Sequence, residues 1–439
     1  MSLSTQPYKG TRDFYPEDKR LQKYIFDTWR SVCELYGYEE YDAPVLEPTE
    51  LYLAKGNEEI IQEQTYTFID RGDRSVTLRT EMTPSVSRMV AAKRQELPYP
   101  LRWYSIPNLW RYERPQKGRL REFWQLNVDI FGVAGVEADQ EVIQLADGIM
   151  QKFGATRDMY AIKLNSRALM NFITDEYLRL DSVQSATLIR LIDRMNKLEG
   201  AEFRGLLEAI FSPSQREAGL AAKLDTILQA KKLDDLPPEL MSQPATMKLA
   251  ALLELLKVQG IKNAAYDPTL MRGFDYYTDI VFELFDNDPT NNRAMFGGGR
   301  YDGLVGQFGV DPVATFGFGM GDVTFQNFLK AHDLLPVSGS VTDVYVILIG
   351  DVFERSQKII AELRSLGVNT AVDISGRKTD KQIKTALKKE VPYVLFIGEQ
   401  ELESEQFKLK NLYANTEETH SIQRIVSIVK DRRQKIKTV

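Results

Sequence analysis

The sequence predicts an α+β protein in two parts: a large domain built on an antiparallel sheet with a helical insertion, then a small α/β domain. Three observations support this prediction. A long β-hairpin runs from Arg102 to Gly132, residues from about 165 to 260 follow a helical pattern, and strand and helix alternate three times after residue 341. Because 439 residues exceed what one core usually holds, we expect two or three domains. The linker in HDLLPVSGSVTD places the boundary between 1–335 and 341–439.

The hairpin combines a strand pattern with an unusual set of charges. Two strand-like runs, WYSIPNLWRYE and EFWQLNVDIFG, flank PQKGR, where Pro115 lacks an N–H donor and Gly118 tolerates a turn. Guanidinium groups bind phosphate through paired hydrogen bonds, so several arginines here predict a polyphosphate ligand. The arginines are Arg102, Arg111, Arg114, Arg119 and Arg121, with Arg300 added if the later GGGRYDG run lies nearby.

Not every residue of the hairpin needs a ligand. A solvated basic tip explains Arg119 equally well. Arg111, Glu113 and Gln125 are interleaved with aromatic residues inside the strand-like runs, which favours an active-site floor over a wet surface.

The segments before the hairpin predict a helix and an edge strand. Residues 19–36 have apolar side chains at helical spacing, and Gly37 is placed to end that helix. Pro44 interrupts the next strand-like run, YEEYDAPVLEP, which suits an edge or an interface.

A second, shorter hairpin leads into a polar helix start. Two strands are expected around a Gly72-Asp73 turn, and Thr83 with Pro84 marks the beginning of the following helix. Glu81 comes directly before it. This carboxylate either pairs with Arg79 or binds the ammonium group of a ligand, and the sequence leaves both open.

A further group of polar residues lies in TLMRGFDYYTDIVFELF, residues 269–285, whose second half alternates with the period of a strand. Arg272 is placed to balance a ligand carboxylate or phosphate, and Tyr276 and Tyr277 to orient a polar ring. A structural ion pair with core tyrosines is the alternative. The glycine-dense runs FGGGRYDGLVGQFG and VATFGFGMGDVTFQNFL would let backbone approach a ligand closely.

The C-terminal part follows a linker at about 336–340. Its apolar strands between helices predict a small parallel or mixed sheet covered on both faces. Its lysines at 378, 381, 384, 388 and 389 fit a solvated helix face and an RNA-binding face equally well.

Composition excludes several classes of function. A net charge of −6 argues against a protein that coats nucleic acid, though it allows a local basic surface. The single cysteine, Cys33, and two separate histidines, His332 and His420, provide neither a disulfide nor a metal-binding set. No apolar run is long enough to span a membrane and the start lacks a signal core, so we expect a cytoplasmic protein with no membrane contact.

Taken together, these motifs resemble those of the class II histidyl-tRNA synthetase family along nearly the whole chain. The combination of RYERPQKGR with RGFDYY is highly specific, and KGTRDFYPED, LRTEMTPSVSRM and GGGRYDGL are similar to further family motifs. The resemblance implies a class II synthetase-type antiparallel catalytic domain with a helical insertion, followed by an α/β anticodon-binding domain. YGYEEYDAPVLEP resembles class II motif 1, which implies a homodimer formed around Pro44.

The resemblance also implies the reaction and the roles of individual residues. A histidine–tRNA ligase activates histidine with ATP to histidyl-adenylate and pyrophosphate, then transfers it to the 3′ end of tRNA(His). Arg111 and Arg272 would be catalytic, and Mg²⁺ would lie on the β- and γ-phosphates. The implied ATP site consists of Arg111, Glu113, Arg119 and Phe123, the last stacked on adenine. The implied histidine site consists of Glu81, Thr83 and Gln125 at the α-amino group, Asp129, Tyr276 and Tyr277 around the imidazole with Tyr301 nearby, and Arg272 at the carboxylate and α-phosphate.

Some positions depart from the family pattern. Asp129 replaces a common glutamate, Trp124 a common histidine and Thr80 a proline, while Thr324 stands where an arginine usually holds the γ-phosphate. The last departure favours an inert paralogue such as the regulatory subunit of ATP phosphoribosyltransferase, but this chain keeps RGFDYY and the C-terminal domain. A synthetase for threonine or proline is the other alternative. The lack of a Cys/His zinc set counts against threonine, and the paired tyrosines favour a hydrogen-bonding aromatic ring.

Overall fold

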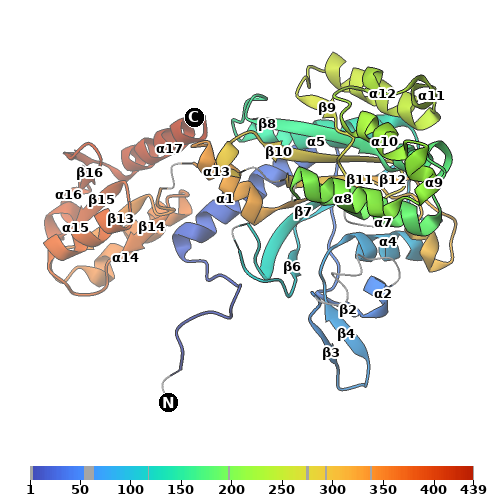
Figure 1. Ribbon diagram of the computed structural model, residues 1–439. Coiled ribbons are helices and arrows are strands. Elements are labelled where there is room, and N and C mark those ends of the chain that lie inside the picture. Colours follow the sequence, from blue (N-terminus) through green and yellow to red (C-terminus); the bar gives the residue numbers. More distant parts are fainter. Residues whose placement is uncertain are drawn as a thin grey trace. The chain divides into compact units, whose positions relative to one another are not determined.

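The computed structural model (Figure 1) describes residues 3–53, 64–116, 118–195, 198–272, 276–291, 294–336 and 339–438. Residues 337–338 of the expected linker and 273–275 within the RGFDYY run lie outside these ranges. The chain divides into two compact units, Met1–Pro336 and Val337–Val439.

The first unit is built on one large sheet, which has nine strands within the described ranges. The inner strands of this sheet run antiparallel to one another. Within the described part, only the strand at each edge, β1 or β9, is parallel to its neighbour. The predicted α+β class with an antiparallel sheet is therefore confirmed. In spatial order the strands are β1 (Glu39–Glu40), β5 (Leu101–Ser105), β7 (Glu122–Phe131), β12 (Thr315–Gly321), β11 (Ala294–Arg300), β10 (Ile280–Asp286), β8 (Tyr160–Ser166) and β9 (Ala264–Tyr266), with β6 (Asn108–Trp110) also paired to β7.

The predicted hairpin is present, but its first arm is broken. Both β5 and β6 pair antiparallel with β7, and Gly118 has a φ of +83° in the connecting loop. Ile106 and Pro107 separate β5 from β6, as expected for a proline that lacks an N–H for the ladder. The run WYSIPNLWRYE, predicted as one strand, is therefore two short strands followed by residues 111–113, which lie outside any strand.

Helices cover one face of the sheet. Two of them, α5 (Val136–Lys152) and α13 (Asp322–Ala331), pack on its central strands, and α1 (Pro16–Leu35) packs against α5 and the outermost strand β1. Leu126, Val128 and Ile130 of β7 belong to the core beneath these helices. Because side chains alternate along a strand, Gln125, Asn127 and Asp129 lie on the opposite, open face.

The chain between β8 and β9 forms a module of helices, coloured green to yellow in Figure 1. Its last helix, α12 (Pro244–Val258), packs against α5, β8 and β9 and so joins the module to the sheet. The other elements are α6 (Arg167–Phe172), η1 (Ile173–Tyr177), α7 (Ser182–Asp193), α8 (Gly200–Ile210), α9 (Pro213–Glu217), α10 (Leu220–Leu228), η3 (Leu233–Asp235) and α11 (Pro238–Met241).

The chain forms a second, small antiparallel sheet from residues that precede β5. It consists of β2 (Leu46–Pro48), β4 (Ser75–Leu78) and β3 (Thr67–Ile69), and β3 and β4 flank the predicted Gly72-Asp73 turn. Pro44 separates β1 from β2, which belong to different sheets, so the strand predicted in YEEYDAPVLEP is divided. The remaining short elements of this unit are α2 (Glu50–Leu53), α4 (Thr83–Ala92), η4 (Pro289–Asn291) and η5 (Val305–Phe308).

The second unit has a mixed sheet covered on both faces, as predicted. Its strand order is β14 (Thr370–Val372), β13 (Val344–Leu348), β15 (Tyr393–Ile397), β16 (Phe407–Asn411) and β17 (Thr416–His420), parallel among the first three and antiparallel thereafter. The β16–β17 hairpin was not predicted. Val344 and Val346 pack with α14 (Phe353–Ser365) and α17 (Ile422–Thr438), whereas Tyr345 and Ile347 pack with α15 (Thr379–Lys388), which explains the continuous apolar strands. A short helix, α16 (Glu399–Ser404), leads into β16.

None of the helices within the described ranges is long and apolar enough to cross a membrane.

Candidate active site

The open face of the main sheet carries a polar cavity with about 400 Å³ of space not filled by protein atoms. Nine of the twelve predicted site residues line it, although they come from distant parts of the chain. These nine are Glu81, Thr83, Arg111, Gln125, Asp129, Arg272, Tyr276, Tyr277 and Tyr301. The other three, Glu113, Arg119 and Phe123, are on the hairpin but not in the cavity lining.

Two glycines of β12 make room for the polar side chains of β7. A Cβ atom on Gly317 would lie 2.1 Å from Asp129 Oδ1, and one on Gly319 would lie 2.2 Å from Gln125 Nε2. Both distances are far below any van der Waals contact. The glycine-dense run therefore lets neighbouring side chains occupy the floor of the cavity, in addition to the close approach of ligand and backbone expected from the sequence.

Asp129 is the buried acid at the centre of the floor. It is 4% exposed and accepts a hydrogen bond from the Tyr301 hydroxyl. Burial raises the pKa of its carboxyl group to about 7, although the Tyr301 bond acts in the opposite direction. A ligand group that donates a hydrogen bond or carries positive charge would favour the ionised form.

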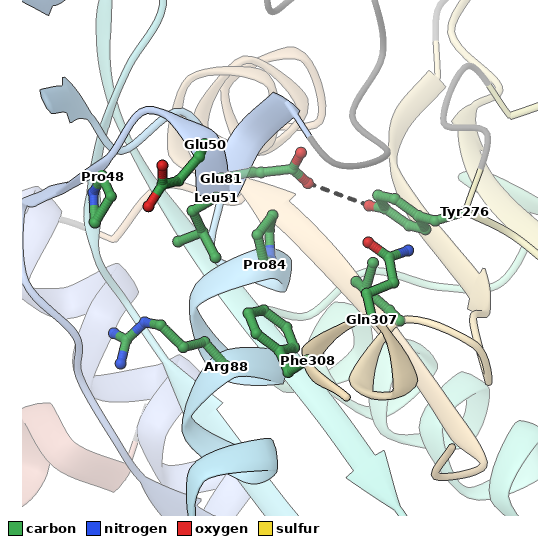
Figure 2. A pocket seen from close by; sticks show the side chains of 10 residues that line it. Pro48, Glu50, Leu51, Glu81, Pro84, Arg88, Tyr276, Gln307 and Phe308 are labelled. Carbon is green, nitrogen blue, oxygen red and sulfur yellow. Dashed lines mark hydrogen bonds between the residues drawn. The ribbon is translucent and has the colours of Figure 1, made fainter. Parts of the chain in front are cut away.

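Glu81 and Tyr276 form one wall of the cavity. The Tyr276 hydroxyl donates to Glu81 Oε2 at 3.2 Å, and Figure 2 shows the two side chains meeting end to end. The same pair also borders a second cavity, lined on its far side by Leu51, Pro84 and Phe308 (Figure 2). Burial raises the pKa of Glu81, whereas the charge of Arg111 lowers it.

The sequence left open whether Glu81 pairs with Arg79. In the structure it does not: Arg79 donates instead to Asp42 Oδ1 at 2.9 Å and to the Ala43 and Asn108 carbonyls. Glu81 is thereby available to the cavity.

Arg272 is held from one side by Glu283, whose Oε1 lies 2.5 Å from its Nη1, while its Nη2 donates to the Gly297 carbonyl at 3.3 Å. Its Nε has no hydrogen-bond partner within the described residues. Burial opposes the charge, but Tyr277, Glu283 and Tyr276 outweigh it, so the pKa of the guanidinium is raised and the group stays positive.

Arg111 joins the cavity to the hairpin. Its Nε donates to the Thr80 carbonyl at 3.0 Å, and its guanidinium carbon lies 5.4 Å from the centre of the Phe123 ring. Farther along the loop, Arg119 pairs with Glu113 at 3.3 Å. Arg111, Glu113 and Arg119 thus form a row of charged side chains that leads from the cavity along the hairpin.

Three of the six arginines named from the sequence do not line the cavity and have partners elsewhere in the protein. Arg102 pairs with Glu141 at 2.7 Å, and Arg300 forms a buried pair with Asp139 at 2.5 Å. Arg121 donates to the Tyr8 hydroxyl at 2.9 Å and lies over the Tyr112 ring.

Thr324 lies in the first turn of α13, beside the hairpin loop. Its hydroxyl donates to the Met295 carbonyl at 2.9 Å, and its Cγ2 would lie 3.5 Å from a Cβ on Gly118. This position therefore adjoins the loop on which the sequence predicts the ATP phosphates.

Sequence reasoning missed Asn127 as a cavity residue and Glu283 as the partner of Arg272. Asn127 could have been found, because it alternates with Gln125 and Asp129 on the same face of β7. The Glu283 pairing could not, because it depends on which strand of the sheet lies next to Arg272.

The comparisons with known proteins agree with this architecture. Residues 10–321 match the family model described as histidyl-tRNA synthetase, and residues 343–432 match the anticodon binding domain. An antiparallel catalytic sheet joined to an anticodon-binding domain defines a class II aminoacyl-tRNA synthetase.

Relatives and solved structures narrow the assignment. The chain is 41% identical to a histidine–tRNA ligase of Leptospira biflexa serovar Patoc over 98% of both chains, and 36% identical to one of Haloarcula marismortui over 92% of this chain and 93% of that protein. The crystal structure of histidyl-tRNA synthetase from Nostoc sp. PCC 7120 covers 98% of this chain and 100% of that one, with a TM-score of 0.82 at 22% identity, which shows the shared fold. The chain belongs to the histidyl-tRNA synthetase family.

Proposed function

We propose that this chain is a histidine–tRNA ligase, which joins histidine to ATP as histidyl-adenylate and then transfers it to the 3′ end of tRNA(His). The observation that carries the proposal is the cavity itself. Two buried carboxylates, three tyrosines and two arginines converge there, which suits a small zwitterion with a polar ring and a phosphate beside it.

Each end of histidine has a matching group. The α-ammonium is assigned to Glu81, Thr83 and Gln125, since a buried carboxylate and two neutral acceptors suit a cation. The imidazole is assigned to Asp129, surrounded by the three tyrosines Tyr276, Tyr277 and Tyr301. The Tyr301 hydroxyl donates to Asp129 Oδ1 and so orients the carboxylate before a ligand arrives.

Arg272 and Arg111 are assigned to the reacting groups. The histidine carboxylate attacks the α-phosphorus, a new P–O bond forms, and the bond to the bridging oxygen breaks as pyrophosphate leaves. This step needs in-line placement and positive charge more than a strong base. Arg272 keeps its charge inside the cavity because Glu283 holds it, and Arg111 approaches from the hairpin.

The remaining hairpin residues are assigned to ATP. Phe123 would stack on adenine, and Glu113 and Arg119 would hold the nucleotide. Mg²⁺ typically binds ATP enzymes through one or two carboxylates together with phosphates, so Glu113 fits as one such ligand. The ion would supply charge neutralisation on the β- and γ-phosphates.

The C-terminal unit is proposed to bind the anticodon part of tRNA(His), and the protein to act in the cytoplasm as a homodimer. The dimer proposal is supported by three consecutive exposed residues: Pro44 and Val45 between β1 and β2, and Leu46 at the start of β2. Val45 and Leu46 are apolar, so their exposure suits an interface.

The function is tested by exchange of labelled pyrophosphate into ATP with each amino acid in turn. Exchange with histidine alone is expected. Exchange with threonine or proline would overturn the assignment of the tyrosine-lined cavity. Histidine binding without any exchange would instead favour the regulatory paralogue, for which Thr324 is the supporting observation.

The raised pKa of Asp129, about 7, predicts that histidine binding weakens in acid. As the pH falls from about 8 to about 6, the carboxyl group takes up a proton and loses its charge, which weakens the hydrogen bond it accepts from the imidazole N–H. KM for histidine should therefore rise about tenfold, while KM for ATP stays constant. Histidine also takes up a proton in this range, so the Asp129→Asn variant, whose histidine KM should show only that smaller dependence, is the control. Identical pH profiles in the two proteins would contradict the role given to Asp129.

A further inference from the structure

Four charged side chains are linked next to the tyrosines of the cavity, and Arg300, one of the four, also pairs with the more exposed Asp302 at 3.3 Å. Two are carboxylates, Asp139 on α5 and Asp279 just before β10. Two are cations, Arg300 at the end of β11 and Lys248 on α12. Lys248 is the member that comes from the helical module.

Lys248 reaches both acids. Its Nζ lies 2.7 Å from Asp279 Oδ2 and 4.0 Å from Asp139 Oδ2, and its side chain is only 25% exposed. Asp139 Oδ2 has no hydrogen-bond partner within the described residues. The lysine is therefore placed between two carboxylates instead of extending into solvent.

The acids are tied to the segments that carry the cavity tyrosines. Asp279 Oδ1 accepts from the Ser166 hydroxyl at 2.8 Å, so this aspartate is held to the end of β8. The N–H of Thr278 donates to the Arg300 carbonyl at 2.7 Å, and its hydroxyl donates to the same oxygen at 3.2 Å. Thr278 and Asp279 are thus fixed just after Tyr276 and Tyr277, and Arg300 is fixed just before Tyr301.

The charge balance makes Lys248 necessary to this arrangement. Asp139 is fully buried, and burial raises the pKa of its carboxyl group to about 6, while Arg300 and Lys248 lower it and Asp279 raises it. Without the lysine, Asp139 and Asp279 would be left with one guanidinium, which also pairs with Asp302. Asp279 has less support than Asp139, because Arg300 bonds Asp139 through both Nε and Nη2. Asp279 is therefore the residue expected to move.

We infer that Lys248 is a positioning residue, through which the helical module holds the Tyr276–Tyr277 segment in its histidine-binding position. The inference rests on the proposed function only in taking histidine as the ligand. The lysine itself does not line the cavity and need not touch substrate.

The test is Lys248→Met, which keeps the length of the side chain and removes its charge. KM for histidine in pyrophosphate exchange should rise about tenfold, with KM for ATP changed less than about twofold. Lys248→Arg should restore most of the affinity. Histidine affinity measured by calorimetry gives the same comparison without catalysis, so a protein that binds histidine but fails to form adenylate still tests this inference.

Two controls separate positioning from a general loss of stability. Lys257→Met removes a lysine from the same helix that is 68% exposed and pairs only with Glu254 among the partners described, and it should change neither KM. Asp279→Asn should reproduce the effect of Lys248→Met, and the double variant should be no worse than either single one if the lysine acts through Asp279. An unchanged histidine KM in Lys248→Met, or additive effects in the double variant, would overturn the inference.

Discussion

Replacing Arg272 with alanine should lower the kcat of histidine-dependent pyrophosphate exchange about 10³-fold, the loss typical for one preorganised donor to a developing charge. The Arg272 side chain is 15% exposed, its raised pKa keeps it charged, and its Nε has no hydrogen-bond partner in the described chain. In the proposed assignment, its removal takes positive charge from the place where the histidine carboxylate and the α-phosphate meet. The kcat and both KM values are measured for the wild-type and variant proteins.

The same substitution leaves Glu283, which is 16% exposed, without its partner, and such an unpaired charge can lower activity through misfolding. The double variant Arg272→Ala/Glu283→Gln removes that unpaired charge. If Arg272 acts on the reacting groups, the double variant stays about as slow as the single one. If it recovers most of the wild-type rate, the arginine has only a structural role and the catalytic assignment is wrong.

Replacing Gly317 with alanine should reduce kcat/KM for histidine about 100-fold and leave KM for ATP nearly unchanged. The new methyl group would overlap Asp129 Oδ1 and come within 2.6 Å of the Val128 carbonyl, so the carboxylate must leave its place beside Tyr301. A displacement that breaks a buried charged hydrogen bond is worth about 1–3 kcal/mol, which at its upper end corresponds to this loss.

Gly303→Ala is the matched control, because a Cβ atom there has nothing within 4 Å among the described residues. It should change the histidine kinetics less than about twofold. Thermal unfolding of both variants shows how much of the effect comes from crowding in the sheet. Wild-type histidine kinetics in Gly317→Ala would mean that Asp129 does not contact the ligand.

The local elements were largely predictable, because they depend on signals a few residues apart. The Gly118 turn, the Gly72-Asp73 turn and the helix beginning at Thr83 follow from turn chemistry and helix-start residues. The broken first arm of the hairpin was missed although Pro107 was visible, since apolar residues continue on both sides of it.

The partners of charged residues were not predictable. The sequence grouped Arg102, Arg121 and Arg300 with a phosphate site because they lie near the right motifs. Their true partners include Glu141 and Asp139 on α5, which are 39 and 161 positions away from Arg102 and Arg300, respectively. No spacing rule connects residues that meet only through sheet order.

By itself, the sequence determined the kinds of chemistry available to this protein: the α+β class, the hairpin, the tyrosine pair after Arg272 and the family to which the motifs belong. Only the tertiary structure decided which of those groups share one cavity and which are neutralised elsewhere. The physical reason is that a residue's type and local geometry are set by its neighbours in the chain. Its burial, its pKa and its partner are set by whichever strands and helices pack against it, as the contrast between Arg272 and Arg300 shows.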